Sequence, residues 1–158
     1  MNTERILILG IGNVLMGDEG IGVHAIRYLE QKELPDDVDL LDGGTGGFHL
    51  LSEMAKYKKV VMIDATLGKD PEGTLTVIKP RFSSDFPSAL SAHDVGLKDL
   101  IEALQLTGLM PEMYLITVSI NPYQELGMEL SMRVSGQLPF IYEKVKGVLN
   151  MLMREKKI

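Results

Sequence analysis

The sequence of 158 residues contains no cysteine. Disulfide bonds, thiolate metal sites and a cysteine nucleophile are therefore all excluded. Basic charge is also scarce, because 16 Lys and Arg stand against 22 Asp and Glu and the net charge is −6. No basic cluster is available to neutralise phosphates, so we do not expect a nucleic acid as a partner.

Long apolar runs are missing as well. No run approaches the roughly 18 residues that a membrane span requires, so we expect no membrane partner. The first five residues lead directly into an apolar segment, so we expect no signal peptide. The hydrophobic fraction of 45% and the charged fraction of 24% are typical of a globular protein. We therefore expect one cytoplasmic domain over residues 1–158.

The first half of the chain alternates between two kinds of segment. Short, mostly apolar runs predict buried strands, and segments with apolar residues three or four apart predict helices. The expected strands cover residues 5–9, 38–41 and 60–63, and the expected helices cover about 19–32 and 48–57. This β-α-β-α-β order predicts a parallel sheet with right-handed crossovers.

The second half departs from that order. Residues 73–78 read as a strand reached through the short loop 68–72, which is too short for a helical crossover. We expect an antiparallel strand at or near the sheet edge. Beyond it we expect a long irregular loop over 80–92, a helix over about 95–105, a strand over 114–120 and a helix over about 132–153. Pro139 lies inside the last segment and predicts a kink or a later helix start.

The glycine-rich stretch from Gly10 to Gly22 joins the first expected strand to the first expected helix. It is not a dinucleotide fingerprint, because the position of the third glycine is occupied by Leu15. The helix is also entered through Asp18 and Glu19. Acidic side chains suit the positive end of a helix dipole but repel a pyrophosphate. The stretch therefore predicts a site for a cation, or for a partner that carries one.

Four polar residues follow expected strands or precede an expected helix at one edge of the sheet: Glu19, Asp42, Asp64 and His93. In open α/β sheets, ligands bind beyond the carboxyl ends of the strands. Among them, the carboxylates of Glu19 and Asp64 and the imidazole of His93 make a candidate site for Ni²⁺ or Zn²⁺ with open coordination positions.

Structural roles also fit each of these residues. Glu19 suits a first helical turn, as does Asp18, which could also cap helix amides. Asp64 could form a turn, and His93 could simply precede a helix capped by Asp94. We expect His24 on a helix flank and His49 on a helix surface. A Ser-His-Asp triad is not favoured, because the serines near His93 lie on a loop without a Gly-x-Ser-x-Gly elbow.

Four ordered motifs carry a resemblance to a known family. They are Gly10-x-Gly12-Asn13-x-Leu15-x-x-Asp18-Glu19-x-x-Gly22, Asp42-Gly43-Gly44-Thr45, Asp64-Ala65 and His93-x-x-Gly96-Leu97. With these motifs the sequence resembles, along its whole length, the hydrogenase maturation endopeptidases, which process the large subunit of [NiFe] hydrogenases. The resemblance implies an α/β three-layer sandwich. Its five-stranded, mostly parallel twisted sheet has one antiparallel strand and helices on both faces.

The resemblance also implies an activity: removal of the C-terminal extension from a nickel-loaded large-subunit precursor. By motif, Glu19, Asp64 and His93 match the family's metal-binding residues. The nickel would be supplied by the precursor, with Zn or Cd as substitutes in vitro, and the protease would act as a monomer. Asp42 is a candidate catalytic base or orienting group. Because the chain has no thiolate, it could recognise nickel without extracting it from cysteine ligands.

Two other function classes remain open at this point. The first is a non-catalytic metal- or cofactor-binding α/β module, since a fold does not define a function. The second is a nucleotide-binding oxidoreductase domain that uses Gly10, Gly12 and Asp42. The missing third glycine and the acidic helix entry count against the second.

Overall fold

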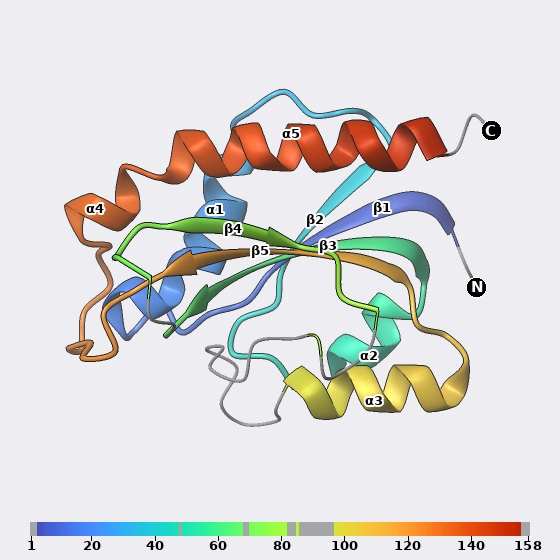
Figure 1. The fold of residues 1–158 in the computed structure, drawn as a ribbon, viewed down its shortest axis with the longest axis horizontal. Coiled ribbons are helices and arrows are strands. Elements are labelled where there is room, and N and C mark those ends of the chain that lie inside the picture. The colour runs from blue at the N-terminus through green and yellow to red at the C-terminus, as the bar shows by residue number, and fades with distance from the viewer. Residues whose placement is uncertain (1–2, 48, 68–69, 82–84, 86–96, 156–158) are drawn as a thin grey trace.

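The computed structural model describes residues 3–47, 49–67, 70–81, 85 and 97–155. Within these ranges the chain forms five strands, five α-helices and one 3₁₀ turn, η1 (Figure 1). In chain order they are β1 (Thr3–Gly10), η1 (Gly17–Gly20), α1 (Ile21–Leu29), β2 (Val38–Asp42), α2 (His49–Met54), β3 (Tyr57–Thr66), β4 (Leu75–Ile78), α3 (Leu97–Thr107), β5 (Glu112–Ser119), α4 (Met132–Ser135) and α5 (Leu138–Glu155).

The strands form one sheet in the order β2-β1-β3-β5-β4. The pairs β1–β2, β1–β3 and β3–β5 are parallel, and β4 runs antiparallel to β5. The expected mostly parallel five-stranded sheet with one antiparallel strand at its edge is confirmed. Strand β4 follows β3 along the chain, but it pairs with β5, which lies between β3 and β4 in the sheet.

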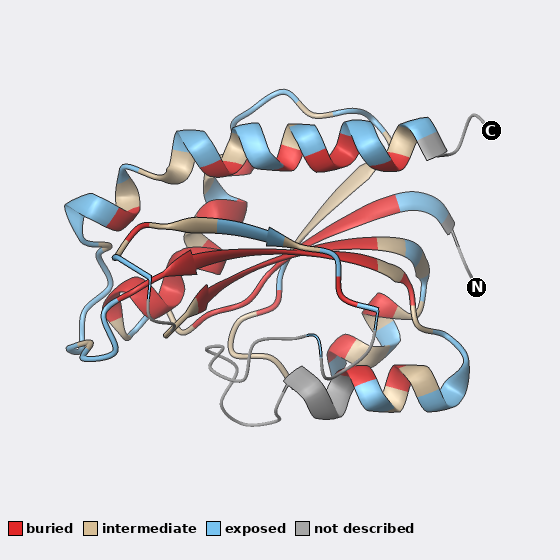
Figure 2. Ribbon diagram, viewed as in Figure 1, coloured by how far each residue is buried: buried red, intermediate tan, exposed pale blue. Residues whose placement is uncertain are grey.

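Side chains alternate between the two faces of the sheet, as the pleat of a strand requires. On β1, Ile6 and Ile8 belong to one apolar cluster, together with residues of α1 and α5. Leu7 and Leu9 belong to a second cluster, together with residues of α2 and α3. The helices therefore cover both faces and make a three-layer sandwich. In Figure 2 the central strands are almost entirely buried, whereas α5 is buried only along the side that faces the sheet.

Several element boundaries differ from those expected, and three of these differences concern η1, the last helices and the strand that carries Asp64. The first helix starts at Ile21 instead of Glu19, because residues 17–20 form a 3₁₀ turn. The long C-terminal segment is divided into α4 and α5, and Pro139 occupies the first turn of α5, where its missing N–H has no cost. Strand β3 continues past Ile63 to Thr66, because β5 pairs with it that far.

No helix in the described ranges is long and apolar enough to cross a membrane. Most of the loop expected over residues 80–92 lies outside the described ranges.

Candidate functional site

The carboxyl ends of the parallel strands lie side by side at one end of the sheet, which we call the carboxyl edge. Gly10, the last residue of β1, is aligned with Asp42 of β2 on one side and with Ile63 of β3 on the other. From β1 the chain continues to β2, and from β3 it continues toward β4 on the opposite side of the sheet. The strand order therefore reverses between β1 and β3, which is where open α/β sheets bind ligands.

Glu19 lies in η1 directly beside this point. Its backbone carbonyl accepts a hydrogen bond from Asn13 N at 3.2 Å, and η1 contacts β3. Gly22 then brings α1 against the strand ends. A Cβ at Gly22 would overlap the carbonyl oxygens of Ile11 and Ile63. This close approach holds Glu19 against the edge, where it is 9% exposed.

Asp64 lies within β3 and is completely buried. Its Oδ1 accepts a hydrogen bond from Ala65 N at 2.8 Å. By the strand alternation its side chain shares a face with Val60 and Met62, the face covered by α2 and α3. Across the ladder it is aligned with Thr117 of β5, which is also buried. A carboxylate this deep is costly unless partners or a ligand stabilise it.

The expected metal-binding trio is only partly visible. Glu19 and Asp64 both lie at the carboxyl edge, but His93 lies outside the described residues. Among the residues that the structure describes, no group of three His, Cys, Asp or Glu is arranged to hold a metal ion. The two carboxylates would supply oxygen ligands, which suit a hard or borderline cation. The complete trio therefore stays a prediction.

Asp42 occupies a more open position at the same edge. It is exposed, and its Oδ1 accepts a hydrogen bond from Gly44 N at 2.9 Å, as a turn-forming aspartate does. It lines a cavity of about 200 Å³ between the two glycine-rich turns, together with Asn13, Arg27 and Thr45. Because β1 separates β2 from β3, Asp42 and Asp64 lie on strands about 10 Å apart. Its expected catalytic role stays a prediction.

Asp18 has a structural role that differs from the one expected. Its Oδ1 accepts from Ser131 N at 2.7 Å and its Oδ2 accepts from Ser131 Oγ at 2.8 Å. Its own N–H donates to Gln124 Oε1 at 2.8 Å. Ser131 is in turn the N-cap of α4. Asp18 therefore ties η1 to a segment more than 100 residues later and caps no amide of its own helix.

The segment between β5 and α4 borders η1. Gly127 N donates to Leu15 O at 2.9 Å, and Gly17 N donates to Gly127 O at 2.8 Å. These two joined segments, together with the first residue of α4, carry several large apolar side chains that are exposed to solvent. We call this set the apolar rim: Leu15, Tyr123, Leu126, Met128 and Met132. Exposed apolar side chains gathered near a site are typical of protein-binding surfaces.

The remaining described histidines lie where expected. His49 is exposed on α2, and His24 is half-buried on the flank of α1. Burial is the main reason that the pKa of His24 lies below its ordinary value, and the nearby Arg27 acts in the same direction. A hydrogen bond to the Met128 backbone and the charge of Asp18 oppose this shift. His24 therefore belongs to the packing between α1 and the apolar rim.

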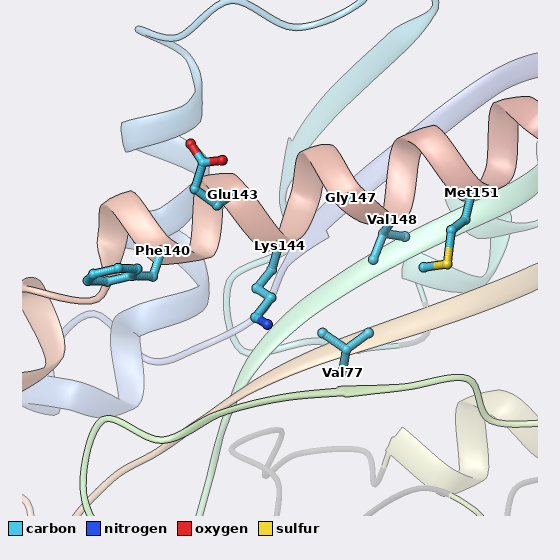
Figure 3. Close-up of a pocket in the computed structure, with 7 residues that line it drawn as sticks. All are labelled: Val77, Phe140, Glu143, Lys144, Gly147, Val148 and Met151. Carbon is cyan, nitrogen blue, oxygen red and sulfur yellow. The ribbon is translucent and has the colours of Figure 1, made fainter.

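A larger groove lies away from the carboxyl edge, between α5 and β4 (Figure 3). Its volume is about 550 Å³, and its lining includes Val77, Lys144, Gly147 and Met151. The sequence analysis missed this groove. One signal was available, because Gly147 interrupts the helical pattern of residues 132–153 without ending the helix.

The comparisons with known proteins agree with one another. The family model described as HycI, hydrogenase maturation protease, matches residues 23–148. The chain is 36% identical over 148 residues to the hydrogenase 2 maturation protease of Escherichia coli (strain K12), covering 92% of this chain and 90% of that protein. It is 38% identical over 141 residues to the hydrogenase expression/formation protein HupD of Rhodobacter capsulatus, covering 87% and 67% of the two chains.

Solved structures show the same likeness. The hydrogenase maturating endopeptidase HybD from E. coli superposes with a TM-score of 0.83 at 36% identity, over 93% of each chain. The [NiFe] hydrogenase maturation protease HycI from Thermococcus kodakarensis KOD1 superposes with a TM-score of 0.74 at 25% identity, over 92% of each chain. These relatives are processing proteases, which supports a peptidase and not a non-catalytic module. The chain therefore belongs to the hydrogenase maturation protease family.

Proposed function

We propose that this peptidase removes the C-terminal extension of a nickel-loaded large-subunit precursor of a [NiFe] hydrogenase. One observation carries the proposal. In a chain of this family, the acidic residues Glu19, in η1, and Asp64, in β3, are both buried near the carboxyl ends of the adjacent strands β1 and β3. The carboxyl ends of the strands are where open α/β sheets bind ligands.

Nickel would be part of the substrate, not a cofactor of this chain. Glu19, Asp64 and His93 would bind the precursor's nickel, and Zn or Cd would substitute in vitro. None of these ligands is a thiolate, and soft thiolates hold such ions more strongly than carboxylate and imidazole do. The site would therefore test for nickel and leave it with the precursor's own ligands. A bound metal ion supplies a Lewis acid that polarises a carbonyl or activates water.

Two further features support a protein substrate. The apolar rim lies beside η1, and its exposed side chains would contact the folded precursor while the peptide enters the site. Asp42, the candidate base or orienting group, is exposed at the same edge and therefore reachable by a peptide. The protease would act as a single-domain monomer in the cytoplasm.

The test is a cleavage assay on a large-subunit precursor, prepared with and without nickel. We expect wild type to release the C-terminal extension only from the nickel-loaded precursor. Glu19→Gln, Asp64→Asn and His93→Ala should each abolish cleavage. Glu30→Gln, an equivalent charge change at the exposed end of α1, should not. Mass spectrometry of the products identifies the cleaved bond.

Two results would contradict the proposal. Cleavage that ignores nickel and survives all three substitutions would make the trio structural. Metal binding without cleavage of any precursor would show a binding module despite the family relationship.

A further inference from the structure

The groove between α5 and β4 is lined mainly by apolar side chains. Val148 and Met151 of α5 and Val77 of β4 line it, and Phe140 stands at one end. Figure 3 shows the side chains of Val77 and Lys144 pointing toward one another across the groove, while Glu143 points away. Phe140, Val77 and Met151 are partly exposed. A ligand would therefore cover apolar surface that is now in contact with water.

The edge of β4 supplies unused backbone groups beside this groove. In the described residues β4 pairs only with β5. Ser119 N donates to Thr74 O at 2.9 Å, so the alternation of an antiparallel ladder directs the backbone of Thr76 and Ile78 toward β5. The N–H and C=O groups of Leu75 and Val77 then face outward. Such a row of donors and acceptors fits an extended peptide.

The charge of Lys144 indicates which kind of peptide would bind in the groove. Glu143 is paired with Lys146 at 2.8 Å, whereas Lys144 makes no ion pair with any described residue. A single cation thus faces an apolar groove in a chain of net charge −6. The complementary ligand is an extended segment that carries a carboxylate, and every C-terminal segment ends in one.

We propose that the C-terminal extension of the precursor binds along β4 as an additional strand. Its backbone pairs with Leu75 and Val77, its apolar side chains enter the groove, and a carboxylate contacts Lys144. This assignment rests on the proposed function. Thr76 of β4 is aligned with Thr117 of β5, and Thr117 is aligned with Asp64 of β3. A peptide paired with β4 is therefore level with Asp64 along the strand direction and lies three strand spacings, roughly 14 Å, to its side, a distance that the extension must cross from the carboxyl ends of the strands.

Amide hydrogen exchange tests the strand addition directly. The full-length wild type is compared alone and with a synthetic peptide of the precursor's C-terminal extension. We expect the amides of Leu75 and Val77 to become protected when the peptide binds. The amides of Thr76 and Ile78 already face β5 and should not change. Protection elsewhere, with none at Leu75 and Val77, would overturn the proposal.

Gly147 offers a matched pair of variants, because a Cβ at this position meets no atom within 4 Å. Gly147→Phe fills the groove, and Gly147→Ala leaves it open. We expect Gly147→Phe to raise the KM for the precursor about ten-fold while kcat is retained, which corresponds to one lost side-chain contact. Gly147→Ala should behave like wild type. Equal KM values for the two variants would overturn the proposal.

Lys144→Gln tests the charge, with Lys56→Gln as the control at an exposed lysine that follows α2, on the opposite face of the sheet from α5. We expect Lys144→Gln to weaken peptide binding about three-fold at low salt, and less at high salt, because an exposed ion pair is weak and screened. No difference between the two variants would contradict the carboxylate contact.

The results separate this proposal from the proposed function. If wild type cleaves the precursor but the Gly147 variants do not differ, only the β4 site is wrong. If wild type cleaves no precursor, the proposed function is wrong, and the peptide exchange experiment still decides the β4 site. Protection of Leu75 and Val77 that appears with rising protein concentration and no peptide would assign the edge to a second copy of this chain, and would also overturn the proposal.

Discussion

The two ends of the parallel strands are built differently. At the amino end, Arg5 of β1 makes a bidentate contact with Asp39 of β2, at 2.8 and 3.0 Å, and Tyr57 of β3 donates to Asp39 at 2.7 Å. These side chains link three neighbouring strands. At the carboxyl end, Glu19 and Asp64 are enclosed beside glycine-rich turns. One end uses its charges to join strands, and the other places acidic groups at the end of the sheet where open α/β folds bind ligands.

The contacts at the amino end shift the pKa values of Asp39 and Tyr57. The hydrogen bond from Arg5 is the main reason that the pKa of Asp39 lies below its ordinary value, and the Tyr57 hydroxyl adds to it. Burial, followed by the hydrogen bond to Asp39, raises the pKa of Tyr57 to about 12. The amino end therefore holds its charges in pairs between strands, whereas the proposed site at the carboxyl end has a pair of buried acidic residues beside structural contacts such as Asp18–Ser131.

The largest effect should come from Asp64→Asn at the carboxyl end. We expect a loss of kcat/KM of at least about 100-fold, because even groups that only orient metal ligands are worth 10- to 100-fold. The variant should still fold, because an asparagine side-chain oxygen can accept the hydrogen bond from Ala65 N, and its free energy of unfolding separates lost chemistry from lost structure. Cleavage kinetics and urea denaturation measure the two quantities. A fully active Asp64→Asn would show that this end carries no chemistry.

The next effect concerns how the carboxyl end is held together. Gly22→Ala should lower the free energy of unfolding by about 3 kcal/mol, because the new Cβ overlaps the carbonyl oxygens of Ile11 and Ile63. Cleavage should fall as well, since η1 and Glu19 must move. Urea denaturation gives the stability change. An unchanged midpoint would mean that the close approach of α1 is not required.

Asp18→Ala should cost about 2 kcal/mol, because hydrogen bonds to a charged acceptor are lost at Ser131 N and Oγ. Ser131→Ala removes the hydroxyl donor and also the long 3.4 Å cap to Val134 N, but it keeps the Ser131 N–H contact and should cost less. Thermal unfolding of both variants measures the difference. An Asp18→Ala variant as stable as wild type would show that its two contacts with Ser131 contribute nothing.

Tyr57→Phe should cost about 1 kcal/mol at neutral pH through the lost hydrogen bond to Asp39, with cleavage retained. The pH dependence has a definite sign. Unfolded tyrosine ionises near 10.0 and folded Tyr57 near 12, so the folded state holds the proton more tightly and wild-type stability falls as pH rises from 10 to 12. Tyr57→Phe should lose this part of the fall.

The contribution of Asp39 to the stability of the fold should change at acidic pH. Its folded pKa is lowered, so its stabilising contribution is present above the ordinary value of 3.8 and is lost as pH falls through the folded pKa. Urea midpoints at several pH values should show this loss in wild type and a flatter acid profile in Asp39→Asn. Identical profiles would contradict the assignment.

The smallest effect lies away from both ends. Gly147→Ala should raise the free energy of unfolding by about 0.5–1 kcal/mol, because alanine favours a helix and the position has open space. Thermal unfolding is the measurement. A destabilised Gly147→Ala would show that the packing around α5 is tighter than the groove implies.

Much of this fold could be predicted from local patterns. The alternation of short apolar runs with helical periodicity predicted the parallel strands, and the short loop after β3 predicted an antiparallel edge strand. Pro139 predicted a kink or a later helix start, and α5 does start at Leu138, because the proline ring and its missing N–H are tolerated in a first turn. The motifs around Glu19 and Asp64 indicated the family. Each of these signals depends on residues that are close together in the sequence, so it can be recognised without the tertiary structure.

Other features were decided only by the tertiary structure. Asp18 read as a helix-start residue, yet its carboxylate bonds to Ser131, 113 positions later. Asp42 resembled Asp64 as an aspartate after a strand, but the sheet order leaves Asp42 exposed and buries Asp64 completely. The groove beside Lys144 exists because α5 packs over an edge strand formed 60 residues earlier. Local patterns indicate whether a segment forms a helix or a strand. The burial of a side chain and its hydrogen-bond partners depend on which distant elements the sheet brings together.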